Sequence, residues 1–412
     1  MPNPPHRPEI PPTAGLPPRW ADLWPRARSA PAHADLARRA AEFLSADRVQ
    51  VECSGTASLV VALTALQRLN RRRAVIVPAY TCPLVALAIA HCGLETRLCD
   101  LAPDSIDFDA DTLARICDRD VLAVVPTHLG GRVADVDTAI GIARRVGAFV
   151  IEDAAQALGA RRNGHAVGLD GDIGFFSLAI GKGLTTYEGG LLVARDPKLG
   201  DELARASREI APRRIGRELG RALQLLGYHT LYRPSLLRYA YGAPLRRALR
   251  RGDAVAAVGD HFSADIPLHT LGRWRQAVGA RAFDRLPAFL DACAVQARRR
   301  KAQLARIDGI EVIDDPVDAA GTWPFLLLRL RSETLRDAAL HGLWGAGLGV
   351  SRLFIHALPD YGYLQRIISE PAVPNARAFA ATTLTISNSP WLDDAAFEQI
   401  CSTLQQLQST ER

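Results

Sequence analysis

Short apolar runs alternate with segments of helical periodicity through the first half of the chain. The runs have the length and composition of buried strands, and apolar residues recur at helical spacing between them. The predicted strands are 49–52, 74–77, 95–99, 121–126, 148–151 and 191–194, and the predicted helices are 32–44, 59–69, 84–91, 109–117 and 136–146. Strands that alternate with helices in this way predict an α/β fold with a mostly parallel, doubly wound sheet.

The pattern changes in the last third of the chain. A long helix is predicted over 287–307, followed by strands at 323–330 and 382–387 and helices at 332–343 and 393–407. A chain of 412 residues can bury the core of two domains. We therefore expect a large domain over 31–260, and a long helix with a smaller C-terminal α/β domain over 261–412.

Residues 1–30 are rich in proline and have little periodicity, which predicts an extended N-terminal arm of the kind that can lie on a partner subunit. No apolar run approaches the ~20 residues that span a bilayer. The first eighteen residues also lack the basic and then apolar order of a secretory signal. The seven cysteines are scattered and have no metal-binding spacing, which is typical of reduced thiols. These features predict a cytoplasmic protein without a metal site.

The net charge of +6 is concentrated in one segment. Residues 213–251 contain ten arginines and one acid, Glu218, for a formal charge of +9, which leaves −3 for the rest. Leucines and tyrosines at partly helical spacing lie among the arginines. Such a segment can make a peripheral contact with an anionic membrane, bind a diphosphate through arginine forks, or form a solvated helical hairpin or subunit contact. Nucleic acid is not an expected partner, because no aromatic–basic recognition motif accompanies the charge.

Two residues with chemical potential follow apolar runs in the middle of the chain. The run 148–151 leads to Glu152 and Asp153, at the strand end where open α/β sheets bind ligands. The stretch 173–180 leads to Lys182, which has glycine on both sides and no acid within five positions. Taken separately, Asp153 could be the N-cap of a helix and Lys182 could be an ordinary surface lysine. Together, they suggest a Schiff-base lysine opposite a carboxylate that holds a protonated pyridine nitrogen, as pyridoxal phosphate requires.

A third feature is the turn Ser54-Gly55-Thr56, which follows the strand 49–52 and precedes a predicted helix. A glycine turn that opens a helix offers free backbone N–H groups and the positive end of the helix dipole to an anion. The alternative is an ordinary N-cap at Ser54 or Thr56.

Several short motifs carry a resemblance to a known family. They are Ser54-Gly55-Thr56-Ala57, Val77-Pro78-Ala79-Tyr80-Thr81, His128-Leu129-Gly130-Gly131, Ile151-Glu152-Asp153-Ala154-Ala155-Gln156, Gly171-Asp172-Ile173-Gly174, Ser177 with Lys182, and Glu188-Gly189-Gly190. In this order and spacing, across about 48–200, the chain resembles the DegT/DnrJ/EryC1/StrS family of sugar aminotransferases, and a weaker similarity continues to about 405. The resemblance implies the aspartate-aminotransferase fold, that of type I transferases dependent on pyridoxal 5′-phosphate (PLP), with PLP as cofactor.

The resemblance also implies residue roles. It assigns Lys182 to covalent cofactor attachment, Asp153 to the ring nitrogen, Gln156 to the ring oxygen, and Gly55, Thr56 and Ser177 to the phosphate. Cys82 departs from the pattern, because family members commonly have an aromatic ring there that lies against the pyridine. Tyr80 is then a candidate for the stacking face, or else a core residue. The family's Glu-x-Gln-Ala-Ala pattern lacks its acid near Arg275, which puts the partner-subunit contacts in doubt.

Three further residues are candidates for substrate binding by the same resemblance. His128 follows a strand end in a loop that lies near the active site in relatives, and a structural role is its alternative. Arg352 and His356 belong to a segment that resembles the family's substrate entrance, and Arg352 could bind a carboxylate or a phosphate.

These observations predict a PLP-dependent aminotransferase. By resemblance, it would move an amino group from an amino acid, glutamate, to a keto sugar linked to a nucleotide, in polysaccharide or secondary-metabolite biosynthesis. A homodimer is implied, because family active sites lie at the subunit interface. The alternatives are a sugar dehydratase, in which histidine typically replaces the lysine, a PLP-binding relative without catalysis, and a basic membrane- or nucleic-acid-binding protein.

Overall fold

The computed structural model describes residues 8–24, 35–369 and 371–410. Within them, a seven-stranded sheet has the order β1-β9-β8-β5-β4-β2-β3. Its strands are β1 (Gln50–Glu52), β2 (Ala74–Pro78), β3 (Glu95–Cys99), β4 (Val121–Val124), β5 (Phe149–Asp153), β8 (Ile173–Ser177) and β9 (Gly190–Ala194). Neighbouring strands from β3 to β8 run parallel, whereas β9 is antiparallel to both β8 and β1. The predicted large, mostly parallel sheet is confirmed.

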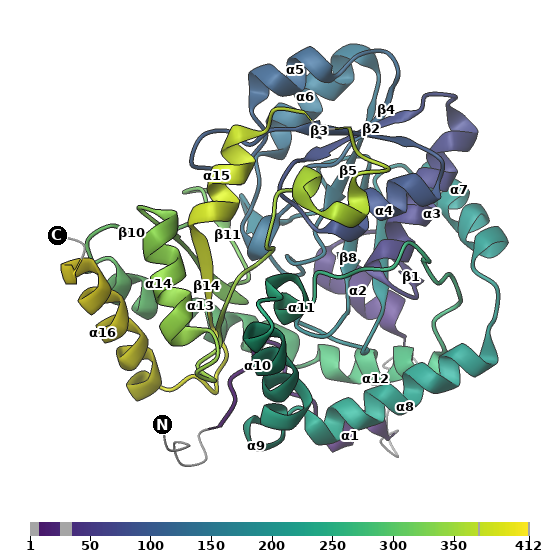
Figure 1. Cartoon of the computed structure of the whole chain (residues 1–412). Coiled ribbons are helices and arrows are strands. Elements are labelled where there is room, and N and C mark those ends of the chain that lie inside the picture. Colours follow the sequence, from purple (N-terminus) through teal and green to yellow (C-terminus); the bar gives the residue numbers. More distant parts are fainter. Residues whose placement is uncertain (1–7, 25–34, 370, 411–412) are drawn as a thin grey trace.

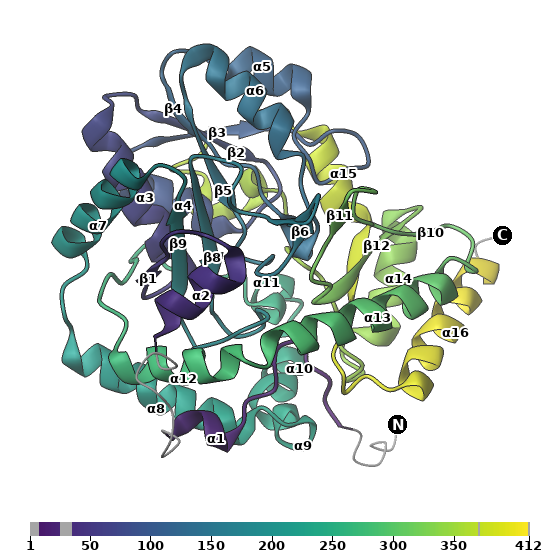
Figure 2. The ribbon, with the colours of Figure 1, turned by 180° about the vertical axis from the view of Figure 1, so that it is seen from behind.

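Helices cover both faces of this sheet (Figures 1 and 2). They are α2 (Leu36–Leu44), α3 (Gly55–Leu69), α4 (Pro83–His91), α5 (Ala110–Ile116), α6 (Val136–Val146) and α7 (Pro197–Ile210). Helix α3 begins at Gly55, four residues before the predicted start at Leu59. The reason is the cap: the Ser54 side chain accepts a hydrogen bond from the Ala57 N–H at 3.0 Å, so the helix can start directly after the strand.

A second sheet forms the C-terminal part, which lies at the left in Figure 1. Its strands are β10 (Ile310–Val312), β12 (Phe325–Leu330), β14 (Thr383–Ser387) and β13 (Val350–Ser351), in that order and antiparallel. The helices around it are α13 (Leu286–Leu304), α14 (Glu333–Leu343), α15 (Pro374–Thr382) and α16 (Asp394–Thr410). A small sheet joins β11 (Ala319–Ala320) to β6 (Arg161–Arg162) and β7 (His165–Ala166), which links the two parts of the chain.

The described part of the N-terminal arm lies on its own chain. The Ile10 N–H donates to the Gly347 carbonyl and the Leu16 N–H to the Gly183 carbonyl, each at 2.9 Å, and both side chains are buried. Helix α1 (Trp20–Leu23) follows. Residues 1–7 and 25–30 of the predicted arm lie outside the described residues.

The basic segment 213–251 is helical. It contains α8 (Ile215–Leu231), α9 (Pro234–Leu237), the π-helical turn η3 (Arg238–Gly242) and α10 (Ala243–Arg250), and α11 (Ala254–Val258) follows it. None of the helices in the described part of the chain combines the length and the apolar composition of a bilayer-spanning helix.

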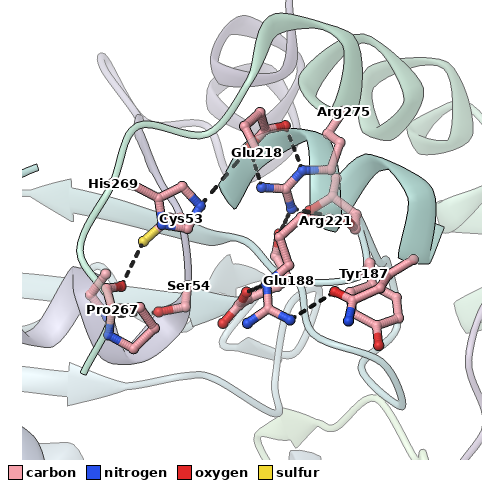
Figure 3. Close-up of polar contacts among 12 residues, drawn as sticks. Cys53, Ser54, Tyr187, Glu188, Glu218, Arg221, Pro267, His269 and Arg275 are labelled. Carbon is pink, nitrogen blue, oxygen red and sulfur yellow. Dashed lines mark hydrogen bonds and ion pairs between the residues drawn. The ribbon is translucent and has the colours of Figure 1, made fainter. Parts of the chain in front are cut away.

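One ion pair connects α8 to α12 (Arg273–Phe283). The fully buried guanidinium of Arg275 donates to both carboxylate oxygens of Glu218, at 2.7 and 2.6 Å, and to the Glu188 carbonyl at 2.6 Å (Figure 3). The one acid of the basic segment therefore neutralises an arginine of another helix in the same chain.

Removal of this acid should destabilise the fold. In Glu218→Ala the guanidinium of Arg275 stays buried without a counter-charge, and we expect the free energy of unfolding to fall by about 3 kcal/mol. Urea denaturation would measure the change. The control is Glu202→Ala, which removes a helical glutamate whose partner, Arg205, is 62% exposed, and this change should cost less than about 1 kcal/mol. Equal effects of the two substitutions would contradict a structural role for the buried pair.

Candidate active site

A cavity of about 420 Å³ lies at the carboxyl ends of β5 and β8, next to the first turn of α3. This is the edge at which open α/β sheets bind ligands. Eight of the predicted site residues line it: Gly55, Thr56, His128, Asp153, Gln156, Ser177, Lys182 and Arg352. Residues that are up to about 300 positions apart in the sequence therefore share one cavity.

Lys182 is the one lysine of this cavity. The chain has three lysines, all within the described residues. Lys198 is exposed, and the Lys301 ammonium binds the Asp314 carboxylate at 2.6 and 2.7 Å. The Lys182 ammonium has neither a hydrogen bond nor an ion pair with any described residue. Burial lowers the pKa of Lys182, against the opposing charge of Asp153, so the neutral, nucleophilic amine is more accessible than in an exposed lysine.

Asp153 ends β5 and is held rigidly. Its N–H donates to the Pro126 carbonyl and its own carbonyl accepts from the His128 N–H, both at 2.9 Å, while Oδ1 accepts from the Ala155 N–H at 3.0 Å. Residues 154–160 form turns, so Asp153 does not cap a helix. Burial raises the pKa of Asp153, whereas the hydrogen bond from the Ala155 N–H and the positive charge of Lys182 lower it. Since no described residue donates to Oδ2, this oxygen can accept a hydrogen bond from a cationic ring nitrogen.

Gly55 and Ser177 bring the helix terminus and a strand end into contact. A Cβ atom at position 55 would stand 2.9 Å from the Ser177 Cβ, closer than side chains approach one another, so the contact requires glycine. The first turn of α3 directs backbone N–H groups into the cavity beside the Ser177 and Thr56 hydroxyls. This set of donors at a positive helix terminus suits a phosphate group.

His128 is held from both sides of its ring. Its Nδ1 accepts from the Ala134 N–H at 3.1 Å, which assigns the ring proton to Nε2, and Nε2 then donates to Glu152 Oε2 at 3.0 Å. Glu152 is fully buried and also accepts from the N–H groups of Gly168 and Gly171, at 2.8 and 2.6 Å. Both ring nitrogens therefore have protein partners, which leaves the carbon atoms and the face of the imidazole to the cavity.

Gln156 reaches the cavity from the loop after β5. Its side-chain oxygen accepts from the Gly130 N–H at 2.6 Å, and its backbone carbonyl accepts from the Thr322 hydroxyl at 3.2 Å. With the oxygen engaged, the side-chain NH₂ group remains as a donor, which suits the role predicted for Gln156 toward a ring oxygen.

Two predicted residues are not brought to the cavity. The Tyr80 hydroxyl hydrogen-bonds to the backbone of Phe354, at 3.1 and 3.2 Å, and its ring packs edge-on against Phe354 and Phe379, so Tyr80 has the core position of the two alternatives. Cys82 lines the cavity nearby, and burial raises the pKa of its thiol to about 12. His356 packs against Tyr361 and does not line the cavity.

Arg352 follows β13 and faces the cavity. Its Nη2 donates to the carbonyls of Ile355, at 2.9 Å, and Ala380, which fixes the side chain. Its Nη1 has no partner among the described residues and can bind an anionic group. Burial lowers the pKa of Arg352, but a guanidinium remains charged at neutral pH.

The site residues predicted from the sequence do not include two acids that also line the cavity, Asp260 and Glu188. Asp260, in the loop after α11, is buried, and its Oδ2 accepts from the Tyr361 hydroxyl at 2.6 Å and the Ile355 N–H at 3.0 Å. The Glu188 carboxylate pairs with Arg221 of α8 at 2.5 Å (Figure 3). Asp260 belongs to none of the motifs, and Glu188 belongs to the motif Glu188-Gly189-Gly190 without a predicted role. Their place at the cavity depends on contacts between segments that are distant in the sequence, which only the fold reveals.

Solved structures with this fold include sugar aminotransferases. A putative sugar aminotransferase from Streptococcus pneumoniae aligns in its apo form with a TM-score of 0.75 at 18% identity, over 98% of each chain. Its PLP form aligns with a TM-score of 0.73 at 19% identity, over 98% of this chain and 99% of that one. The predicted aspartate-aminotransferase-like fold is confirmed.

The DegT/DnrJ/EryC1/StrS aminotransferase family model matches residues 26–225, so this part of the chain is similar to that family. The match agrees with the family that the sequence motifs predicted, and the aligned structure from Streptococcus pneumoniae is a PLP form.

Two curated relatives are informative. Protein MosB of Rhizobium meliloti is 40% identical over 40% of this chain and 32% of its own length. The L-glutamine:2-deoxy-scyllo-inosose aminotransferase of Streptomyces kanamyceticus is 33% identical over 51% of this chain and 50% of its own length. The matches thus span about a third to a half of these relatives.

The buried Glu152 should make stability depend on pH. Burial alone would raise the pKa of Glu152, but the hydrogen bonds from His128, Gly171 and Gly168 bring it below the ordinary value of 4.5. A lowered folded-state pKa contributes stability above pH ~4.5 that is lost as the pH falls through the folded-state value. Glu152→Gln should therefore melt at a lower temperature than the parent at pH 7, and the difference should narrow below pH ~4.5. A difference that is constant from pH 7 to pH 4 would contradict this prediction.

Proposed function

We propose that this protein is a PLP-dependent aminotransferase that transfers an amino group from an amino acid to a keto sugar. The observation that carries the proposal is the cavity itself, in which an unpaired lysine and a buried aspartate lie together with a set of hydrogen-bond donors that suits a phosphate. The family match supports the same reaction class.

The residues present fit the cofactor. Gly55, Thr56 and Ser177 would hold its phosphate, Gln156 would donate to its ring oxygen, and Asp153 would hold a proton on its ring nitrogen. When bound, the cofactor supplies a cationic ring that stabilises negative charge at the α-carbon of the amino donor.

The remaining chemistry belongs to Lys182. Its amine would attach the cofactor, be released when the donor arrives, and then remove the proton from the donor's α-carbon. A pKa lowered by burial favours this role, because a general base must be neutral at working pH. Asp153 supports the step from a distance, since its carboxylate keeps the ring nitrogen protonated.

We propose a nucleotide-linked keto sugar as the acceptor and glutamate as the donor, with a homodimer as the working unit. The relatives named for GDP-perosamine synthesis and for spore coat polysaccharide biosynthesis support sugar acceptors. Since L-glutamine is named as the donor of an inosose aminotransferase relative, both glutamate and glutamine are tested below.

The test of the cofactor site begins with borohydride reduction and peptide mapping of the purified protein. We expect a cofactor adduct on Lys182, because Lys198 is exposed and Lys301 is paired. Lys182→Ala should lose the adduct and reduce amino transfer by at least about 100-fold. Activity would be followed as 2-oxo acid formation from glutamate or glutamine with a panel of nucleotide-linked keto sugars.

Lys198→Ala is the matched control and should retain both adduct and activity. An adduct at another lysine, or normal amino transfer by Lys182→Ala, would overturn the assignment. An adduct on Lys182 without transfer to any acceptor would favour a PLP-binding relative without catalysis.

The substitution Asp153→Asn tests the contribution of the carboxylate charge alone. Asparagine has the same shape and can still accept from the Ala155 N–H, but it cannot hold the ring nitrogen in its protonated form. We expect amino transfer to fall by about 100-fold or more, while borohydride still fixes the cofactor on Lys182. Rapid mixing with the amino donor alone would locate the loss in the donor half-reaction. An unchanged donor half-reaction would rule out the proposed role of Asp153.

A further inference from the structure

Helix α8 has its apolar residues on the side that faces away from the protein. Ile215, Leu219 and Leu223 are 84%, 61% and 61% exposed, and their spacing of four residues aligns them along one side of the helix. The glycines between them, Gly216 and Gly220, have no neighbouring atom within 4 Å of the place where a Cβ would stand. We call Ile215, Leu219 and Leu223 the outer face of α8. No described part of the chain covers it.

The charged side chains of α8 point elsewhere. Glu218 faces inward to Arg275, and Arg221 faces inward to Glu188 (Figure 3). Arg217 stands about 160° around the axis from Leu219, at 100° per residue. The polarity of α8 is thus the reverse of that of an ordinary surface helix, which turns its charged residues toward water.

The surroundings of the outer face are positively charged. Arg213 and Arg214 are exposed directly before α8, and the acid within 213–251, Glu218, is already paired with Arg275. Helix α1 lies beside the other end of α8, where the Trp20 ring is 6.3 Å from the His229 ring (Figures 1 and 2). Trp20 is 48% exposed and Trp24 is 68% exposed.

We propose that the outer face of α8, together with its exposed arginines, docks on an anionic lipid surface. Isoleucine and leucine side chains would enter the acyl boundary, the arginines would reach the lipid phosphates, and tryptophans are typical of the interface between headgroups and hydrocarbon. This binding mode does not depend on the proposed transamination.

Charge favours lipid over a second copy of the chain. A two-fold symmetric contact would place the same surface of both copies together, and here each surface belongs to a segment with a formal charge of +9. Such surfaces repel one another, whereas an anionic bilayer attracts each of them.

The position of α8 gives the contact a consequence for the cavity. Arg221, on the inner side of α8, pairs with Glu188, which lines the cavity. A bilayer on the outer face would therefore lie about one helix diameter, ~10–12 Å, from a wall of the cavity.

Vesicle flotation with the full chain tests the proposal. The probes are vesicles of phosphatidylcholine alone and of phosphatidylcholine with about 30% phosphatidylglycerol. We expect binding to the anionic vesicles that weakens as salt rises. The triple variant Ile215→Ser, Leu219→Ser, Leu223→Ser should bind at least about 10-fold more weakly. The variant Arg213→Gln, Arg214→Gln should lose most of the preference for anionic lipid.

The control is Leu69→Ser with Val295→Ser, which removes two apolar side chains that are 52% and 58% exposed elsewhere. It should bind vesicles like the parent, and all variants should keep the parent's melting temperature, because the changed side chains are exposed. Absence of binding at about 0.1 M salt, or equal loss in the control, would overturn the proposal. It would also fail if the serine variant bound vesicles normally but changed the molar mass in light scattering, since α8 would then be a subunit contact.

Discussion

A fully buried carboxylate fixes the geometry of the cavity. Successive side chains of a strand point to opposite faces, so Glu152 and Asp153 at the end of β5 are directed apart. Glu152 turns away from the cavity and accepts hydrogen bonds from His128, Gly168 and Gly171. These bonds connect two loops, 125–135 and 167–172, to one strand end. Asp153 is therefore directed to the cavity side of the strand. Hydrogen bonds at its backbone N–H and carbonyl hold it there.

In this arrangement His128 contributes to the shape of the cavity wall, although both of its ring nitrogens bind protein groups. An unpaired buried carboxylate is costly, and each donor to Glu152 reduces that cost. A histidine whose Nε2 donates to Glu152 and whose Nδ1 accepts from Ala134 also joins the loop after β4 to the loop that enters α6. The ring therefore positions the cavity wall around Asp153, whatever further contact its face makes with a ligand.

The sequence predicted the elements of the large sheet well because their apolar runs are buried on both faces, and such runs contain little else. It also predicted Asp153 at a strand end from the apolar run before it, whereas Ser177 came only from the family resemblance. It did not predict Asp260, because the Tyr361 hydroxyl and the Ile355 N–H that hold it come from about 100 residues away. Tyr80 shows the same limit: a motif placed it near the cavity, but only packing against Phe354 and Phe379 decides which way its ring points.

Almost all basic residues of the chain are arginines, and this limits which side chains can react with an aldehyde. Of the 50 lysines and arginines, three are lysines, so nearly all structural ion pairs use guanidinium groups. A guanidinium does not lose its proton at neutral pH and cannot act as the amine nucleophile, whereas a buried ammonium can. The arginines next to the cavity, Arg221 and Arg352, can therefore neutralise acids or bind anions. They would not react with the aldehyde of the proposed cofactor. Lys182 is the one amine among the described residues that line the cavity, so in the proposed reaction it is the side chain that would attach to the cofactor aldehyde.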